Sequence, residues 1–227
     1  MKVRAVVNPS TGFTLVELAI VLVIVALLIG GMLIPLSAQK DIQNINETQK
    51  RLAEIKEALL GFAVVNRRLP CPDTDADPTA AGYGIEEASC LAGLAAEGYL
   101  PWKTLGVSQT DAWGTNRVNS TDPRNGDWRY RADRNFAQTI LLATSFSADG
   151  LAVQDNSGNN LTSASERPVA IVFSAGPNLV ADLGNSSYEP TGGGYQAGDR
   201  SPTFDDMVIW VGRPILFNRM ISAGVLP

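Results

Sequence analysis

The sequence predicts an α+β fold, in which a long N-terminal helix packs on an antiparallel β-sheet. Apolar residues fill positions 18–36 and then recur at helical spacing as far as residue 62. Three later stretches, residues 127–131, 169–173 and 207–211, are rich in the β-branched and aromatic residues that strands prefer. A single long helix followed by separate strands is typical of this class.

Composition limits the chemistry open to the chain. Its 227 residues suffice for one ordinary domain and an appended segment, and 45% of them are apolar, which is enough for a core. A net charge of −5 makes the chain a poor partner for nucleic acid. Histidine is absent, which excludes Ser-His-Asp and Cys-His catalysis and every histidine-ligated metal site.

The helix begins in the segment TGFTLVELAIVLVIVALLIGG, residues 11–31. The nineteen positions 18–36 are nearly all apolar, which is within the range for a membrane-spanning helix. A cleaved secretory signal would have a shorter apolar core and a small residue where Leu36 stands. A plain single-span anchor fits the length, but it leaves Gly12 and Glu17 unexplained.

The segment GFTLVE, residues 12–17, follows a short leader that carries Lys2 and Arg4. It resembles the N-terminus of type IV prepilins and type II secretion pseudopilins. The resemblance implies that the prepilin peptidase cuts between Gly12 and Phe13 and methylates the new Phe13 terminus. It also implies a filament subunit that assembles with other pilin-like subunits and is not an enzyme. The alternative is a membrane-tethered exported binding protein or enzyme with an unrelated head.

Glu17 places a carboxylate at the start of the apolar helix, where an isolated charge is costly. After cleavage, the ammonium group of Phe13 in a neighbouring subunit could pair with it, since a paired buried charge is tolerated. Glu17 would then set the register of assembly. The alternative is that Glu17 extends to the lipid headgroups from one turn inside the membrane.

The basic leader indicates the topology. Lys2 and Arg4 are expected to stay cytoplasmic, so the single span places the head on the periplasmic side of the inner membrane, and later in a filament. The expected organisation comprises a leader, a membrane or filament-core helix, an amphipathic helix and a globular head, at residues 1–12, 13–36, 37–66 and 67–227. The large head favours a minor or initiating subunit, and a pilus, a secretion system and DNA uptake all remain open.

Turn-forming residues and one short helix complete the expected head. Pro70 and Pro72 should end the long helix near residue 66. Apolar residues between 215 and 221 indicate a short C-terminal helix that stops at Gly224. The only cysteines, Cys71 and Cys90, should form a disulfide in an oxidising compartment, with a stabilising effect of about 3 kcal/mol.

Two acidic patterns could hold calcium. Asp73, Asp75 and Asp77 alternate like the opening of a calcium loop, but Pro78 and Gly84 stand where glycine and glutamate are required. A solvated turn is therefore the favoured interpretation.

The second pattern pairs residues 174–178 with the later segment FDDMVI, residues 204–209. It is similar to the C-terminal loop of major pseudopilins, in which aspartates before the last strand hold calcium. The resemblance implies Asn178, Asp205 and Asp206 as ligands, with Asn178 at a position where an aspartate is expected. Alternatively, Asp205 and Asp206 cap a turn that enters the strand.

Aromatic residues concentrate in two predicted loops, GYLPW at residues 98–102 and DAWG at residues 111–114. Exposed, they could bind a partner or a sugar. We expect them to be buried, because large aromatic side chains usually close a core.

Overall fold

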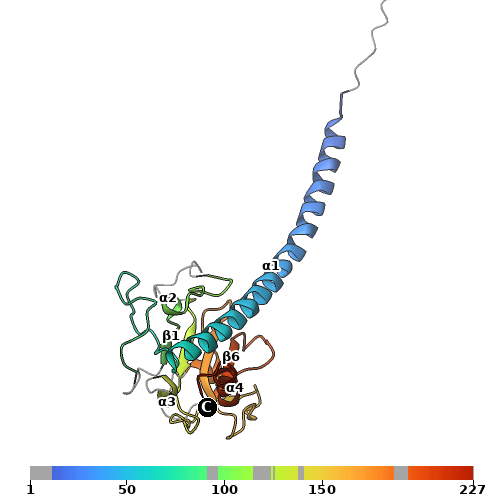
Figure 1. Ribbon diagram of the computed structural model, residues 1–227. Coiled ribbons are helices and arrows are strands. Elements are labelled where there is room, and N and C mark those ends of the chain that lie inside the picture. Colours follow the sequence, from blue (N-terminus) through green and yellow to red (C-terminus); the bar gives the residue numbers. More distant parts are fainter. Residues whose placement is uncertain are drawn as a thin grey trace, which may run out of the picture. The chain divides into compact units, whose positions relative to one another are not determined.

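The computed structural model describes residues 12–90, 97–114, 124, 126–137, 141–186 and 194–226, without the side chains of 31–38. The chain divides into two compact units, residues 1–43 and 44–227. Helix α1 (Leu15–Asn66) begins in the first unit and ends in the second (Figure 1). The four-stranded antiparallel sheet lies in the second unit, so the predicted α+β class is confirmed.

The second half of α1 forms one side of the main core. Leu52, Ile55 and Leu59 are buried at the predicted helical spacing, and Ala63 continues the same face. The helix ends at Asn66, as predicted. Arg67 adopts a left-handed backbone conformation with φ of 55° and caps the last turn through its N–H bond to the Ala63 carbonyl.

The main sheet has the strand order β1-β2-β4-β6, with antiparallel pairing throughout. Its strands are β1 (Glu97–Tyr99), β2 (Arg129–Ala132), β4 (Pro168–Ser174) and β6 (Met207–Gly212). The three predicted strands correspond to β2, β4 and β6, whereas β1 was not predicted. Every residue of β4 is buried, because β4 is an inner strand that is covered on both faces.

The two faces of the sheet pack against different elements. Ala170 and Val172 belong to the core that contains α1, whereas Ile171 and Phe173 belong to a smaller core on the opposite face. That smaller core is closed by a two-stranded parallel sheet, β3 (Ala152–Gln154) and β5 (Gly194–Gln196). The head is therefore a three-layer arrangement of helix, sheet and small sheet.

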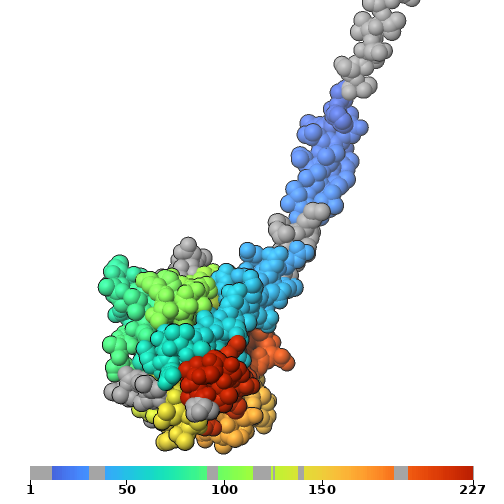
Figure 2. All heavy atoms as spheres, in the orientation of Figure 1, coloured from blue at the N-terminus to red at the C-terminus, as the bar shows by residue number. Residues whose placement is uncertain are grey.

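Short helices fill the remaining connections: α2 (Trp102–Leu105), α3 (Arg134–Ala137), the 3-10 helix η2 (Leu183–Ser186) and α4 (Arg213–Ser222). The predicted C-terminal helix is thus confirmed as α4. Leu216 and Met220 of α4 enter the main core. In Figure 2, α4 (red) lies against the second half of α1 (cyan), where Arg219 pairs with Glu57.

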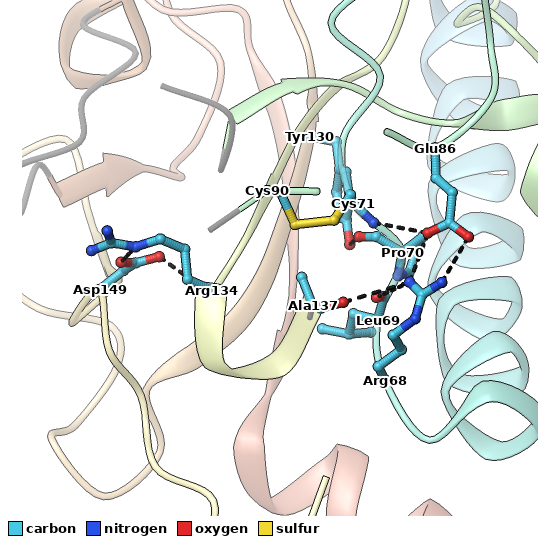
Figure 3. Close-up of a disulfide and its surroundings, with 10 residues drawn as sticks. All are labelled: Arg68, Leu69, Pro70, Cys71, Glu86, Cys90, Tyr130, Arg134, Ala137 and Asp149. Atoms are coloured by element: carbon cyan, nitrogen blue, oxygen red, sulfur yellow. Dashed lines mark hydrogen bonds and ion pairs between the residues drawn. A yellow bond between two sulfur atoms is a disulfide. The ribbon is translucent and has the colours of Figure 1, made fainter. Parts of the chain in front are cut away.

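A disulfide fastens the segment that follows α1. Cys71 and Cys90 are bonded, as predicted, and both are buried (Figure 3). Glu86 pairs with Arg68 at 2.7 Å and also accepts the Cys71 N–H at 3.2 Å. The Tyr130 hydroxyl donates to the Pro70 carbonyl at 3.0 Å, which ties the same segment to β2.

Candidate functional site

Three carboxylates meet beside the start of β6. Oxygens of Asp182, Asp205 and Asp206 all lie within 4.8 Å of one another. Asp205 and Asp206 immediately precede β6, and Asp182 immediately precedes η2. Backbone donors fix two of the carboxylates: the Asp182 N–H bonds to Asp206 Oδ2 at 2.9 Å, and the Asp205 N–H bonds to Asp182 Oδ2 at 2.7 Å.

A second set of groups holds this cluster in place. Asn185 is fully buried, and its Nδ2 donates to Asp206 Oδ2 at 2.8 Å and to the Gln196 carbonyl at 2.9 Å. Gly176 has a φ of +61°, and a Cβ there would collide with the Asp205 side chain. The ends of β4, η2 and β5 therefore all contribute to the position of the carboxylates.

Backbone strain brackets Asp182. Leu179 and Leu183 have φ values of 67° and 46°, in the left-handed region that branched side chains rarely adopt. Such strain costs free energy and persists only where surrounding contacts impose it. Both residues flank the loop whose Asp182 bonds to Asp205 and Asp206.

The protein environment opposes ionisation of Asp206. Burial raises the pKa of its carboxyl to about 7, although hydrogen bonds from Asn185 and the Asp182 N–H act in the opposite direction. The carboxylates of Asp182 and Asp205 raise it further. Asp206 Oδ1 is buried and has no hydrogen-bond partner within the part of the chain that the structure describes. A hard cation such as calcium fits these donors, because it prefers several oxygen ligands and would neutralise the repulsion.

The structure brings together part of the predicted ligand set. Asp205 and Asp206 are adjacent in the cluster, but Asn178 is exposed, and its Oδ1 accepts the Val180 N–H at 2.7 Å. Asp182, which the sequence analysis did not single out, supplies the third carboxylate. A search for acidic residues over the whole loop between β4 and β6 would have included it.

The earlier acidic pattern forms a turn that is closed by an arginine. Asp73 Oδ2 pairs with Arg124 at 2.7 Å and accepts the Gly84 N–H at 2.8 Å, while Oδ1 accepts the Asp75 N–H. Arg124 lies 3.7 Å from the ring centroid of Tyr99 and also pairs with Asp127. The positive charge beside Asp73 is therefore supplied by the guanidinium group of Arg124.

The aromatic loops are less buried than expected. Trp102 and Trp113 are both half-buried, and Trp113 packs at the edge of the main core. The DAWG loop docks on α1 through polar contacts. The Ala112 N–H donates to Thr48 Oγ1 at 3.1 Å, and Arg51 Nη1 donates to the Asp111 carbonyl at 2.8 Å.

A reciprocal cap starts α1. Thr14 donates to Glu17 Oε2 from both its backbone N–H and its hydroxyl, each at 2.8 Å. The Glu17 N–H in turn donates to Thr14 Oγ1 at 3.2 Å. This is a capping box, in which the threonine and the glutamate three residues later satisfy each other's backbone donors. The Glu17 carboxylate is therefore held at the N-terminal end of its own helix.

The helix that follows this cap exposes its apolar side chains. Phe13 is 88% exposed, and the leucine, isoleucine and valine residues from Leu15 to Ile29 are all more than 40% exposed. A helix that is apolar all round has to be covered by a membrane or by other helices. No helix within the described ranges, from which the side chains of 31–38 are missing, is long and apolar enough to cross a membrane.

Comparison with protein families identifies this segment. Residues 8–33 match the family model of the prokaryotic N-terminal methylation motif. The chain carries a prepilin-type signal. This is the signal of type IV pilins and pseudopilins, so the resemblance read from residues 12–17 is confirmed. Searches of curated proteins and of solved structures gave no significant match.

The prepilin signal indicates how such a chain is processed and assembled. It implies processing by a prepilin peptidase and assembly with other pilin subunits, and it supports a type IV pilin-like or pseudopilin subunit. Gly12 and Phe13 are both exposed and precede α1, while residues 1–11 of the expected leader lie outside the described part of the chain. An exposed, non-helical junction is accessible to a peptidase.

Proposed function

We propose that the chain is a minor or initiating pilin-like subunit of a type IV pilus or type II secretion-type machine. It acts by assembly and not by catalysis. The observation that carries this proposal is the prepilin-type signal, whose Glu17 is capped by Thr14 directly before an exposed apolar helix. A large head with long loops between β4 and β6 supports a minor subunit over a major one.

The proposed route begins in the inner membrane. The leader stays cytoplasmic, the apolar helix spans the membrane once, and the head lies on the periplasmic side. After cleavage and methylation the helix leaves the membrane for the filament core. Glu17 then pairs with the Phe13 ammonium group of a neighbouring subunit, which compensates the charge that burial would otherwise leave unpaired.

Mass spectrometry of the protein extracted from membranes tests this proposal. We expect the mature chain to begin at Phe13 and to carry one N-terminal methyl group. An intact Met1 terminus, or a terminus near Gln39, would instead favour a tethered protein with an unrelated function.

We further propose that Asp182, Asp205 and Asp206 bind calcium. A cation that binds only the folded state raises the melting temperature, by an amount that grows with the logarithm of its excess over the dissociation constant. Millimolar calcium should therefore raise the melting temperature of the full chain relative to chelator. Asp182→Asn should abolish this shift, whereas Asn178→Ala should retain it, since Asn178 lies outside the cluster. An equal shift in both variants would contradict this ligand set.

A further inference from the structure

The two edge strands of the main sheet, β1 and β6, differ in how their outer edges are covered. Strand β1 has only three residues, and its outer edge is covered because Tyr99 and Asp73 exchange backbone hydrogen bonds of 2.8 and 2.9 Å. Strand β6 pairs with β4 on one side and has no strand partner on the other among the described residues. The six residues of β6 include neither a charge nor a proline.

A groove borders the start of β6. It has a volume of about 530 Å³ and lies entirely within the second unit. One wall is α1, with Ile45, Gln49 and Leu52, and the other is formed by Asp206–Ile209 at the start of β6. Residues 197–200 close the groove. Apolar side chains of α1 and residues of an edge strand thus border the same space.

An uncharged apolar edge strand is a liability that folded proteins usually protect. Charged side chains, prolines, bulges or covering loops normally prevent edge-to-edge pairing. The only irregularity of the β4–β6 pairing lies between Pro168 and Ala170, opposite the far end of β6. Within the described part of the chain, the start of β6 therefore combines an edge that has no strand partner with apolar side chains of α1, which is the arrangement that binds an added strand.

We propose that this groove binds an extended segment of another pilin-type subunit, which adds to β6 as a further strand. This inference rests on the proposed function, because that function supplies the neighbouring subunits. Three residues of β6, Met207–Ile209, border the groove, so the added segment pairs over about three residues, or about 10 Å at the rise of a strand.

Charge indicates the chemistry of the added segment. The charged side chains that line the groove have both signs, with Lys56 and Arg200 against Asp199 and Asp206, so the groove does not favour a strongly charged segment. Alternate side chains should be apolar, because every second one faces the floor formed by Leu52 and Met207.

Symmetrical pairing of β6 with β6 of a second copy does not fit assembly in one membrane. A two-fold axis through antiparallel edges would keep both α1 helices on the same sheet face and reverse one relative to the other. Subunits that insert their N-terminal helices from the same side need a common direction. The added segment therefore comes from a different part of the neighbouring subunit.

A photo-crosslinking residue at Ala53, which is exposed and borders the groove, tests the proposal in the full chain in intact cells. We expect crosslinked peptides from a protein that has its own prepilin-type signal. Ile209→Lys should lower the yield by about tenfold, because a charge at an edge blocks strand addition, while Ile209→Val should retain it. Crosslinks only to secreted proteins or lipid, or a yield that Ile209→Lys leaves unchanged, would overturn the inference.

A second pair of variants changes only exposed side chains of α1. Gln49→Trp fills the groove from an exposed position on α1, and Lys50→Trp places the same bulk at the neighbouring position, which does not line the groove. Only Gln49→Trp should reduce the crosslink, and equal reduction by both would contradict the assignment. The N-terminus of each variant is measured in parallel. If the wild-type chain begins at Phe13 but gives no crosslink, the proposal for the groove is wrong and the proposed function stands. If the chain is not cleaved, the proposed function itself is wrong.

Discussion

Asp206 has a carboxyl group whose ionisation is unfavourable in the folded protein. Burial is the main reason that its pKa rises to about 7 from the ordinary value of 3.8. The nearby carboxylates of Asp182 and Asp205 raise the pKa further. In calcium-free buffer, the Asp206 carboxyl ionises near pH 4 in the unfolded chain, but only near pH 7 in the folded chain. The contribution of Asp206 to stability is therefore present at low pH and is lost as the pH rises through that window.

Replacing Asp206 by asparagine should remove this pH dependence. With chelator present, Asp206→Asn should raise the free energy of unfolding at pH 8 by on the order of 1–3 kcal/mol, and it should change stability little at pH 4. Urea unfolding of the full chain at both pH values measures the difference. Ser157→Ala, on an exposed loop, is the control. A variant that is less stable than the wild type at pH 8 would refute the raised pKa.

The ligand cluster shows how far sequence reasoning reaches at the scale of residues. Adjacent aspartates before an apolar strand identified Asp205 and Asp206, because neighbours in sequence stay neighbours in the fold. Asp182 bonds to Asp205 across 23 positions, so their proximity depends on tertiary structure and not on local sequence. Asn178 matched the expected spacing, but its side chain caps its own turn instead.

At the scale of elements, a buried hydroxyl on α1 helps to hold the DAWG loop. Thr48 is fully buried, and its Oγ1 accepts the Ala112 N–H at 3.1 Å. Thr48→Val keeps the shape but leaves that N–H without its acceptor, so we expect a loss of about 1–3 kcal/mol in stability. Amide hydrogen exchange should accelerate at Ala112. Thr48→Ser keeps the hydroxyl and should preserve the protection; fast exchange in both variants would mean that packing, not this bond, holds the loop.

Elements with a strong local pattern were predictable, and elements created by tertiary pairing were not. Strands β4 and β6 are runs of branched apolar residues, and α4 has an apolar face and a glycine stop, so each was visible in the sequence. Strands β1, β3 and β5 have three residues each, and partners distant in sequence form them. No local periodicity exists in so short a stretch.

At the scale of the whole molecule, the chain combines two units with different requirements. Residues 44–227 bury their own core on both sides of a sheet. In residues 1–43, the described apolar side chains are exposed, so this unit needs an environment that the chain itself does not provide. The prepilin-type signal at residues 8–33 lies wholly within that first unit. We therefore expect variants near the N-terminus to change processing or assembly without changing the folding of the head.

Glu17 is the residue at which assembly can be tested, because its role in the helix cap and its charge can be removed separately. Glutamine also completes a capping box with Thr14, so Glu17→Gln keeps the helix start and deletes only the charge, whereas Glu17→Ala deletes both. Membrane insertion and cleavage should survive in both variants, since a neutral side chain enters hydrocarbon more easily and the cut lies upstream. Incorporation should fail in both, because the Phe13 ammonium group of the neighbour loses its partner. The measurement is the fraction of processed protein in sheared or cross-linked filaments. Unchanged incorporation of both variants would mean that Glu17 only reaches the headgroups and that the apolar helix faces alone set the register; failure of Glu17→Ala alone would assign the effect to the cap.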